Sequence, residues 1–188
     1  MAPKVKITIE DIVNTAIELV RKSGSEAINA RAVAAALDCS TQPVFSNFDS
    51  MESLKAAVIT SAYNRYLDFL KNEVESERYP RYKAYGMAYV RFAKEERELF
   101  KLLFMRDRTG EDISPPTDFN ESVEMIMKAN GFSREKAMLM HLEIWACVHG
   151  IGVMIATSFL SFDFETVSNM LSDVYQGIKA RFLLEENK

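Results

Sequence analysis

The sequence predicts an all-α fold of about nine helices. Only 7 glycines and 5 prolines interrupt the 188 residues, which favours long helices. Apolar residues recur at spacings of three and four along most of the chain, as they do on one face of a helix. We find no convincing strand pattern. The helices divide into a small N-terminal unit, residues 1–49, and a larger bundle, residues 50–188.

The composition limits the classes of protein that the chain can belong to. Hydrophobic residues make up 48% and charged residues 27%, which is typical of a soluble globular protein. The net charge of −4 argues against attraction of the whole molecule to nucleic acid, so any DNA contact must come from a local patch. Two cysteines are too few for a disulfide framework, and the start lacks a secretory pattern, so we expect a cytoplasmic location.

Start and stop signals define the first helices. Thr8 with Asp11 three residues later is a capping-box variant, and Ser23-Gly24 ends the apolar repeat that follows. Asn29 is the expected cap of a second helix, residues 30–37, whose alanines have high helix propensity.

A short third helix is expected over residues 40–47. Asp38 lies where the chain must turn, and aspartate tolerates a left-handed conformation there. We expect Ser40 to cap this helix, which puts Pro43 in the first turn, where its missing N–H costs little. Val44 and Phe48, four residues apart, should face inward. The next helix is expected to begin after Ser50.

The remaining helices follow from periodicity and breakers, with a loop over residues 105–117 that contains Gly110, Pro115 and Pro116. The expected ranges are 81–94, 96–105, 118–130, 134–159 and 165–184. Residues 144–160 contain no Asp, Glu, Lys or Arg, and seventeen residues is the lower limit for a membrane span. Because His149 lies within this segment and the flanks carry no Lys/Arg bias, we interpret it as a helix buried in protein.

Two short helices separated by a turn of about three residues form a helix-turn-helix pattern, whose second helix enters the DNA major groove. Polar side chains on residues 40–47 suit contacts with base edges, and nearby cations suit contacts with phosphates. The candidate DNA-contacting residues are Lys4, Lys6, Arg31, Thr41, Gln42, Pro43, Phe45, Ser46, Asn47 and Lys55. From spacing alone, these polar residues could equally face water. Residues 1–48 carry five basic and five acidic residues, so charge does not separate the two readings.

The stretch "INARAVAAALDCSTQPVFSNFDSMESLKAAV", residues 28–58, resembles the DNA-binding signature of the tetracycline-repressor (TetR) family. The cap, the turn, the aromatic pair Phe45 and Phe48, and Leu54 all fall in the family's register. Asp38 replaces the usual turn glycine, Phe45 the usual tyrosine, and Met51 a frequent lysine. The resemblance implies a transcriptional regulator, most often a repressor, that binds a palindromic operator as a homodimer through its last two helices.

The segment "WACVHGIG", Trp145–Gly152, is similar to a Trp-x-x-x-His-Gly element of one class of TetR ligand domains. If the chain is a regulator, the middle helices should enclose a small apolar or aromatic effector. Each aromatic residue there could instead be an ordinary residue of the hydrophobic core. The candidate pocket residues are Tyr85, Tyr89, Phe92, Phe100, Phe104, Met125, Trp145, His149 and Met154.

No enzyme motif, cofactor motif or metal-ligand spacing occurs in the sequence. His141 and His149 do not have the i, i+4 spacing of two ligands on one helix face. We therefore expect neither catalysis, nor a cofactor, nor a metal, nor a membrane. The alternative function is an all-α small-molecule-binding or sequestering module that has lost DNA binding.

Overall fold

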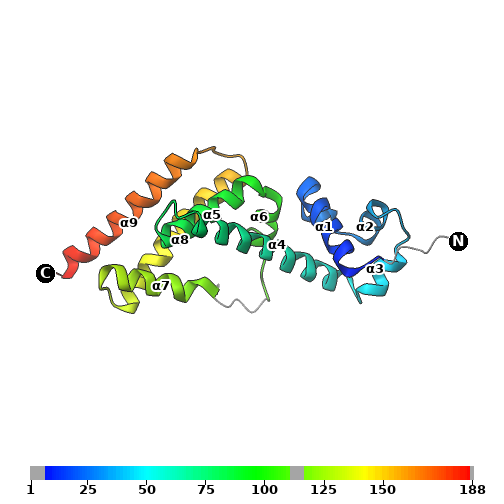
Figure 1. Ribbon diagram of the computed structural model, residues 1–188, viewed down its shortest axis with the longest axis horizontal. Coiled ribbons are helices and arrows are strands. Elements are labelled where there is room, and N and C mark those ends of the chain that lie inside the picture. Colours follow the sequence, from blue (N-terminus) through cyan, green and yellow to red (C-terminus); the bar gives the residue numbers. More distant parts are fainter. Residues whose placement is uncertain (1–6, 111–116, 187–188) are drawn as a thin grey trace. The chain divides into compact units, whose positions relative to one another are not determined.

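The computed structural model describes residues 7–110 and 117–186 (Figure 1). Within these ranges the chain forms nine α-helices and one short 3₁₀ turn, and no strand. The all-α prediction is therefore confirmed for the described residues. The helices are α1 (Ile9–Ser23), α2 (Ala30–Ala36), α3 (Gln42–Asn47), α4 (Met51–Glu75), α5 (Arg81–Glu95), α6 (Arg97–Phe104), α7 (Thr117–Asn130), α8 (Arg134–Ala156) and α9 (Phe164–Glu186).

The predicted caps of the first two helices are present. The Asp11 N–H donates to Thr8 Oγ1 (3.1 Å) and the Thr8 N–H to Asp11 Oδ2 (2.9 Å), which completes a capping box. Gly24 ends α1 with φ +79°, a backbone conformation that favours glycine. Asn29 Oδ1 accepts the Ala32 N–H at the start of α2 (2.9 Å). Local sequence chemistry therefore sets these helix ends.

The end of α8 differs from the prediction. The helix stops at Ala156 and not at Phe159, because Ser158 adopts a left-handed conformation with φ +59°. The N–H groups of Phe159 and Leu160 turn back to the Met154 carbonyl, which closes the helix end. The apolar run thus continues past the helix into the connection to α9.

The chain forms two compact units. Unit 1 contains α1, α2, α3, the first part of α4 to Leu67, and residues 96–106 with α6. Its buried apolar side chains come from every one of these helices: Ile12, Ala16, Ile17, Val20, Val33, Val44, Leu54, Val58, Leu99 and Phe100. Arg21 Nε donates to Glu96 Oε2 (2.8 Å) and joins α1 to the start of α6.

Of the described residues, unit 2 contains 68–95, 107–110 and 117–186, with α5 packed against α7, α8 and α9. Gly86 lies on α5 where α8 and α9 both come close. A Cβ atom there would be 3.0 Å from Leu171 Cδ1 and 3.3 Å from Val148 Cγ2. Glycine therefore permits the close approach of these helices.

The contact units do not coincide with the predicted division at residue 49/50, since residues 50–67 and 96–106 pack with the N-terminal helices. The division into a DNA-binding part and a ligand-binding part concerns function, and it stays a prediction. Within the described residues, α8 alone is long and apolar enough to cross a membrane, a test that core helices of soluble proteins also pass. It packs against α5, α7 and α9.

Candidate functional site

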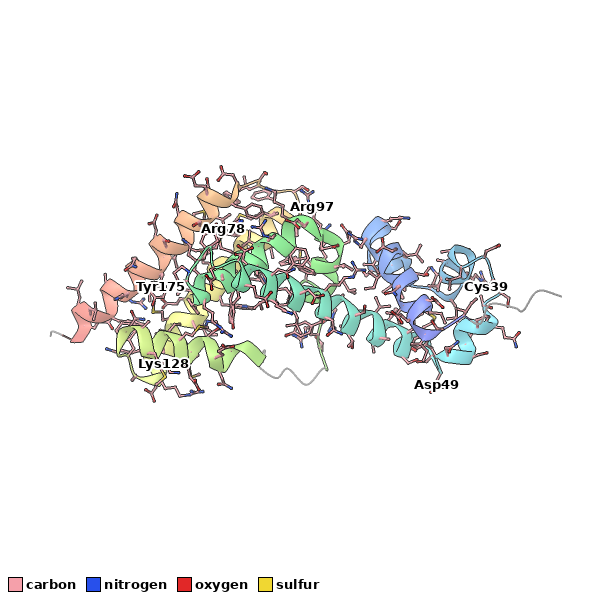
Figure 2. The ribbon with its side chains drawn as sticks, in the orientation of Figure 1. Cys39, Asp49, Arg78, Arg97, Lys128 and Tyr175 are labelled. Carbon is pink, nitrogen blue, oxygen red and sulfur yellow. The ribbon has the colours of Figure 1, made fainter. Side chains whose placement is uncertain are left out.

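Helices α2 and α3 are two short consecutive helices joined by a turn. Residues 37–41 separate the two helices, a longer turn than the predicted one. Asp38 lies in the left-handed region with φ +51°, as predicted from the turn chemistry. The Cys39 N–H donates to the Ala34 carbonyl (3.0 Å) and fixes the reversal of the chain after α2. Figure 2 labels Cys39 before α3 and Asp49 after it.

The cap of α3 differs from the prediction. Thr41 and not Ser40 is the N-cap residue, and its side chain makes no capping hydrogen bond. The Val44 and Phe45 N–H groups both donate to the Thr41 carbonyl (3.1 and 3.3 Å). A cap at Ser40 would put Pro43 at the third helical position, where it offers no N–H to the serine side chain.

One side of α3 packs into unit 1 and the other faces solvent. Val44 and Phe48 are buried, as their spacing predicted. Gln42, Phe45 and Ser46 are exposed, and Phe45 leaves 56% of its surface in solvent. Thr41, Pro43 and Asn47 are half-buried. These three exposed side chains form the part of α3 that another molecule can reach.

Asn47 behaves differently from the other candidate contact residues. Its Nδ2 donates to the Pro43 carbonyl within α3 at 2.7 Å. This carbonyl lies in the short helix α3, and Asn47, four positions on, is the last residue of that helix. One N–H of the Asn47 amide therefore stabilises α3 itself, which leaves fewer of its hydrogen-bonding groups for a base edge.

Charged residues around α3 are few and mixed in sign. Residues 29–55 contain the cations Arg31 and Lys55 and the anions Asp38, Asp49 and Glu52, all exposed. Hydrogen bonds from its own backbone N–H and from the Ser50 side chain lower the pKa of Glu52. Lys4 and Lys6, which we predicted to contact DNA, lie outside the described residues.

The start of α4 follows the expected pattern. The Ser53 N–H donates to Ser50 Oγ (3.1 Å), and the Leu54 N–H donates to the Ser50 carbonyl. Ser50 therefore caps α4, as predicted. Lys55 is exposed on the first turns of this helix, close in sequence to the end of α3.

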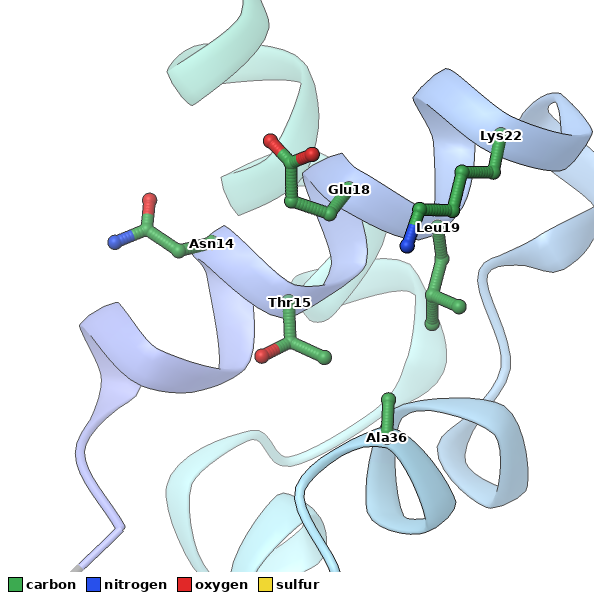
Figure 3. A pocket seen from close by; sticks show the side chains of 6 residues that line it. All are labelled: Asn14, Thr15, Glu18, Leu19, Lys22 and Ala36. Carbon is green, nitrogen blue, oxygen red and sulfur yellow. The ribbon is translucent and has the colours of Figure 1, made fainter.

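An open depression lies on unit 1 beside α1 and α2 (Figure 3). Its lining residues are Asn14, Thr15, Glu18, Leu19, Lys22 and Ala36. Most of these side chains are polar, and the Leu19 side chain is directed toward Ala36 in Figure 3. The depression lacks the apolar enclosure that a small-molecule site needs.

The structure divides the predicted pocket residues between the two units. Tyr85, Tyr89 and Phe92 are buried on α5. Met125 on α7 and Met154 and His149 on α8 are half-buried in the same unit. Phe100 and Phe104 belong to unit 1, where the Phe104 ring meets the Tyr66 ring edge-on with centroids 5.3 Å apart. Trp145 is 47% exposed, so it does not line a closed core.

Two tyrosine–histidine pairs connect α5 to α8. The Tyr82 hydroxyl lies 2.9 Å from His141 Nδ1, and the Tyr89 hydroxyl 2.8 Å from His149 Nδ1. Burial lowers the pKa of both histidines and raises the pKa of both tyrosines, which favours the neutral forms. The Trp145 ring stacks on His149 with centroids 5.2 Å apart. His149 therefore lies between a buried tyrosine and an exposed tryptophan.

The sequence did not indicate a buried ion pair in unit 2. Arg91 Nε on α5 donates to Glu73 Oε2 on α4 at 2.9 Å, and the Glu73 side chain is only 6% exposed. The Arg91 guanidinium lies 4.3 Å from the centroid of the Phe164 ring, and Lys94 Nζ lies 4.6 Å from it. Arg91 thus contacts α4 and α9 from α5. Single charged residues on separate helices give no sequence signal of such pairing.

One side of α8 exposes large apolar residues. Met138, Leu142 and Trp145 occupy positions i, i+4 and i+7, which fall on one face of a helix, and Leu142 and Trp145 are each 47% exposed. Further exposed apolar residues in unit 2 are Leu139, Phe159, Leu160, Leu183 and Leu184. Such a concentration of apolar surface is typical of an interface with another protein chain.

Comparison with known proteins agrees with this architecture. Residues 82–172 match the family described as "Tetracyclin repressor-like, C-terminal domain". A search of the curated proteins gave no significant match.

Two solved structures have similar folds. One is a protein of unknown function from Rhodococcus sp. RHA1, with a TM-score of 0.72 and 21% identity over 93% of this chain and 97% of that chain. Another is a TetR family member from Streptomyces coelicolor A3, with a TM-score of 0.60 and 15% identity over 88% of this chain and 96% of that chain. The family match and the all-α fold agree, and residues 82–172 form a domain of the tetracyclin repressor-like C-terminal family.

Proposed function

We propose that the chain is a ligand-responsive, DNA-binding transcriptional repressor that binds a palindromic operator as a homodimer. The observation that carries this proposal is the exposed side of α3, which buried Val44 and Phe48 hold outward, in a chain whose residues 82–172 match the family's C-terminal domain. A helix of six residues buries little surface of its own, so its packing serves to present Gln42, Phe45 and Ser46. In this proposal the protein acts in the cytoplasm, and its function is to bind DNA and an effector, not to catalyse a reaction.

In the proposed mechanism an effector changes the affinity for DNA through α4. This helix contributes residues to both compact units, so it links the region of α3 to the C-terminal domain covalently. An effector bound among the α5 and α8 side chains Tyr89, Phe92 and His149 acts only if it prefers one arrangement of the chain. Repression then ends when the effector stabilises the arrangement with weaker DNA affinity.

The first test is DNA binding and its salt dependence. We expect the protein to bind the DNA upstream of its own gene, and Arg31→Ala and Lys55→Ala each to make the plot of log K against log salt shallower. Each phosphate contact contributes a slope of about 0.9, so loss of one contact from both protomers reduces the slope by about 1.8. Mobility-shift titrations at several salt concentrations measure this, with Lys128→Ala on α7 as the control.

An unchanged slope in both variants would remove Arg31 and Lys55 from the interface, and no shift of any DNA would contradict the proposed function.

The second candidate function is a ligand-binding module without DNA binding. The charge of residues 29–55 favours this candidate. Three acidic and two basic side chains give a formal charge of −1, and Met51 supplies no cation, so this region does not attract DNA. Ligand binding without DNA retention at low salt distinguishes this candidate.

The homodimer is proposed to form through α8 and α9. Replacing Leu142 and Trp145 with glutamate places two charges on the exposed apolar face of α8, where an interface would bury them without partners. We expect the Leu142→Glu/Trp145→Glu protein to be monomeric at micromolar concentration, while the unchanged chain is dimeric. Analytical ultracentrifugation measures this, and Lys128→Glu is the control for added negative charge. A double variant that stays dimeric would place the interface elsewhere.

A further inference from the structure

The exposed side of α3 combines two polar side chains with one large apolar one. Phe45 is 56% exposed and is the only large apolar residue exposed within residues 29–55, all of which the structure describes. Gln42 lies three residues before it and Ser46 directly after it, so amide, phenyl ring and hydroxyl share one face. Single exposed apolar residues are common on protein surfaces, so the surroundings of Phe45 decide its role.

Neither α3 nor the turns directly before and after it carry a cation that would anchor the helix to phosphates. The helix itself, QPVFSN, has no ionisable residue, and its two flanking turns carry the exposed carboxylates of Asp38 and Asp49. The Asn47 amide is engaged with the Pro43 carbonyl. Carboxylates at both ends of α3 repel phosphates, which leaves the uncharged centre of the helix for contact with base edges.

A phenyl ring restricts what Phe45 can recognise there. It neither donates nor accepts a hydrogen bond, so it satisfies no phosphate oxygen and no polar base-edge atom. The apolar group at the major-groove edge of a base pair is the C5-methyl group of thymine, and 5-methylcytosine carries a methyl group at the same ring position. Burying this methyl group against the ring removes apolar surface of both from water.

We propose that Phe45 is the specificity-determining residue of α3 and that it reads the C5-methyl group of one pyrimidine in each operator half-site. Gln42, one turn earlier on the same face, pairs with an adenine about one base-pair step away, since three residues of helix rise about 4.5 Å. This inference rests on the proposed function, because it requires that α3 enters the major groove.

The experiment begins with the full-length protein and a random duplex library. Duplexes retained through several rounds are sequenced, and each thymine of the enriched half-site is replaced in turn by deoxyuridine, which lacks only the methyl group. At one fixed salt concentration we expect one thymine per half-site whose replacement weakens binding about fourfold, the value for one buried methyl group, and about fifteenfold when both half-sites are changed.

Two variants and one modified base make the test specific. Phe45→Ala should bind the thymine and deoxyuridine duplexes equally, whereas Gln42→Ala should keep the full difference. Because both side chains are exposed, neither substitution removes core packing. Replacing the sensitive thymine–adenine pair with 5-methylcytosine–guanine or cytosine–guanine separates the methyl group from the base. If the methyl group strengthens binding by a similar factor in thymine over deoxyuridine and in 5-methylcytosine over cytosine, the protein reads the methyl group alone. If it strengthens binding only in thymine over deoxyuridine, the thymine base is required as well.

The outcomes separate the two levels of the proposal. A library in which no duplex is enriched contradicts the proposed function and this inference together. This inference is overturned if the enriched duplexes contain no pyrimidine whose methyl group affects binding, or if the Phe45→Ala protein keeps the full preference for thymine. Either result leaves the proposed function in place. Loss of methyl sensitivity in Phe45→Ala alone supports it.

Discussion

Replacing Gln42, Phe45 and Ser46 together with alanine is expected to lower the affinity for operator DNA at least about a hundredfold. A bidentate contact to a base contributes about 1–3 kcal/mol of discrimination, and a dimer makes every contact twice. The three side chains are the exposed ones of α3, so their removal leaves the buried contacts of Val44 and Phe48 unchanged. The result should be a folded protein that has lost specific binding.

Mobility shifts with the enriched duplex measure this loss, and circular dichroism confirms that the helices remain. The matched control is Asn64→Ala/Leu67→Ala, which removes one exposed polar and one exposed apolar side chain from α4 in the same compact unit. Its affinity should stay within about twofold of the unchanged protein, since surface substitutions outside a binding face change little. Equal losses in the two variants would mean that α3 is not the reading helix.

Glu73→Ala is expected to reduce the free energy of unfolding by about 3–5 kcal/mol, the range measured when one partner of a buried ion pair is removed. Glu73 is 95% buried overall, and its Oε2 accepts from Arg91 Nε at 2.9 Å. Without it, the Arg91 guanidinium keeps only Glu95, whose closest oxygen is 3.5 Å away and whose side chain is 49% exposed. The uncompensated charge, next to Phe164, accounts for the cost.

Denaturant unfolding of the full chain measures the change. Glu75→Ala is the control on the same helix, because its pair with Lys71 is solvent-exposed on both sides and contributes less than about 0.5 kcal/mol. Glu73→Gln keeps the shape and one acceptor but removes the charge, so its loss should fall between the two. A Glu73→Ala protein as stable as Glu75→Ala would show that the pair contributes nothing to unit 2.

Local sequence chemistry predicted much of the N-terminal helices. The caps at Thr8, Asn29 and Ser50 and the left-handed Asp38 are decided by residues within four positions, and the structure confirms them. Ser40 is not the cap, because Pro43 offers it no N–H and the Val44 and Phe45 N–H groups donate to the Thr41 carbonyl, so the helix begins one residue later. Here the competing backbone contact was not readable from residue type alone.

The packing of the C-terminal helices was harder to predict from the sequence. The periodicity predicted where α5 and α8 lie in the sequence, but it did not predict which of their faces are buried. Because α8 is apolar on most sides, its sequence pattern does not distinguish a buried face from an exposed one. Trp145 was therefore placed with buried Phe92, although it is half exposed. The Glu73–Arg91 pair joins residues on two helices, and only the packed structure brings them together. Sequence supplied the candidates, and tertiary packing separated core residues from surface residues.

Gly86 has a consequence for how the bundle tolerates mutation. At this point on α5, no atom larger than hydrogen separates the backbone from Leu171 on α9 and Val148 on α8. The smallest possible insertion, one methyl group, must displace a side chain on at least one neighbour. A substitution at Gly86 therefore requires side chains on α8 and α9 to give way by a few tenths of an ångström, so this position limits how closely the three helices can pack with any larger residue.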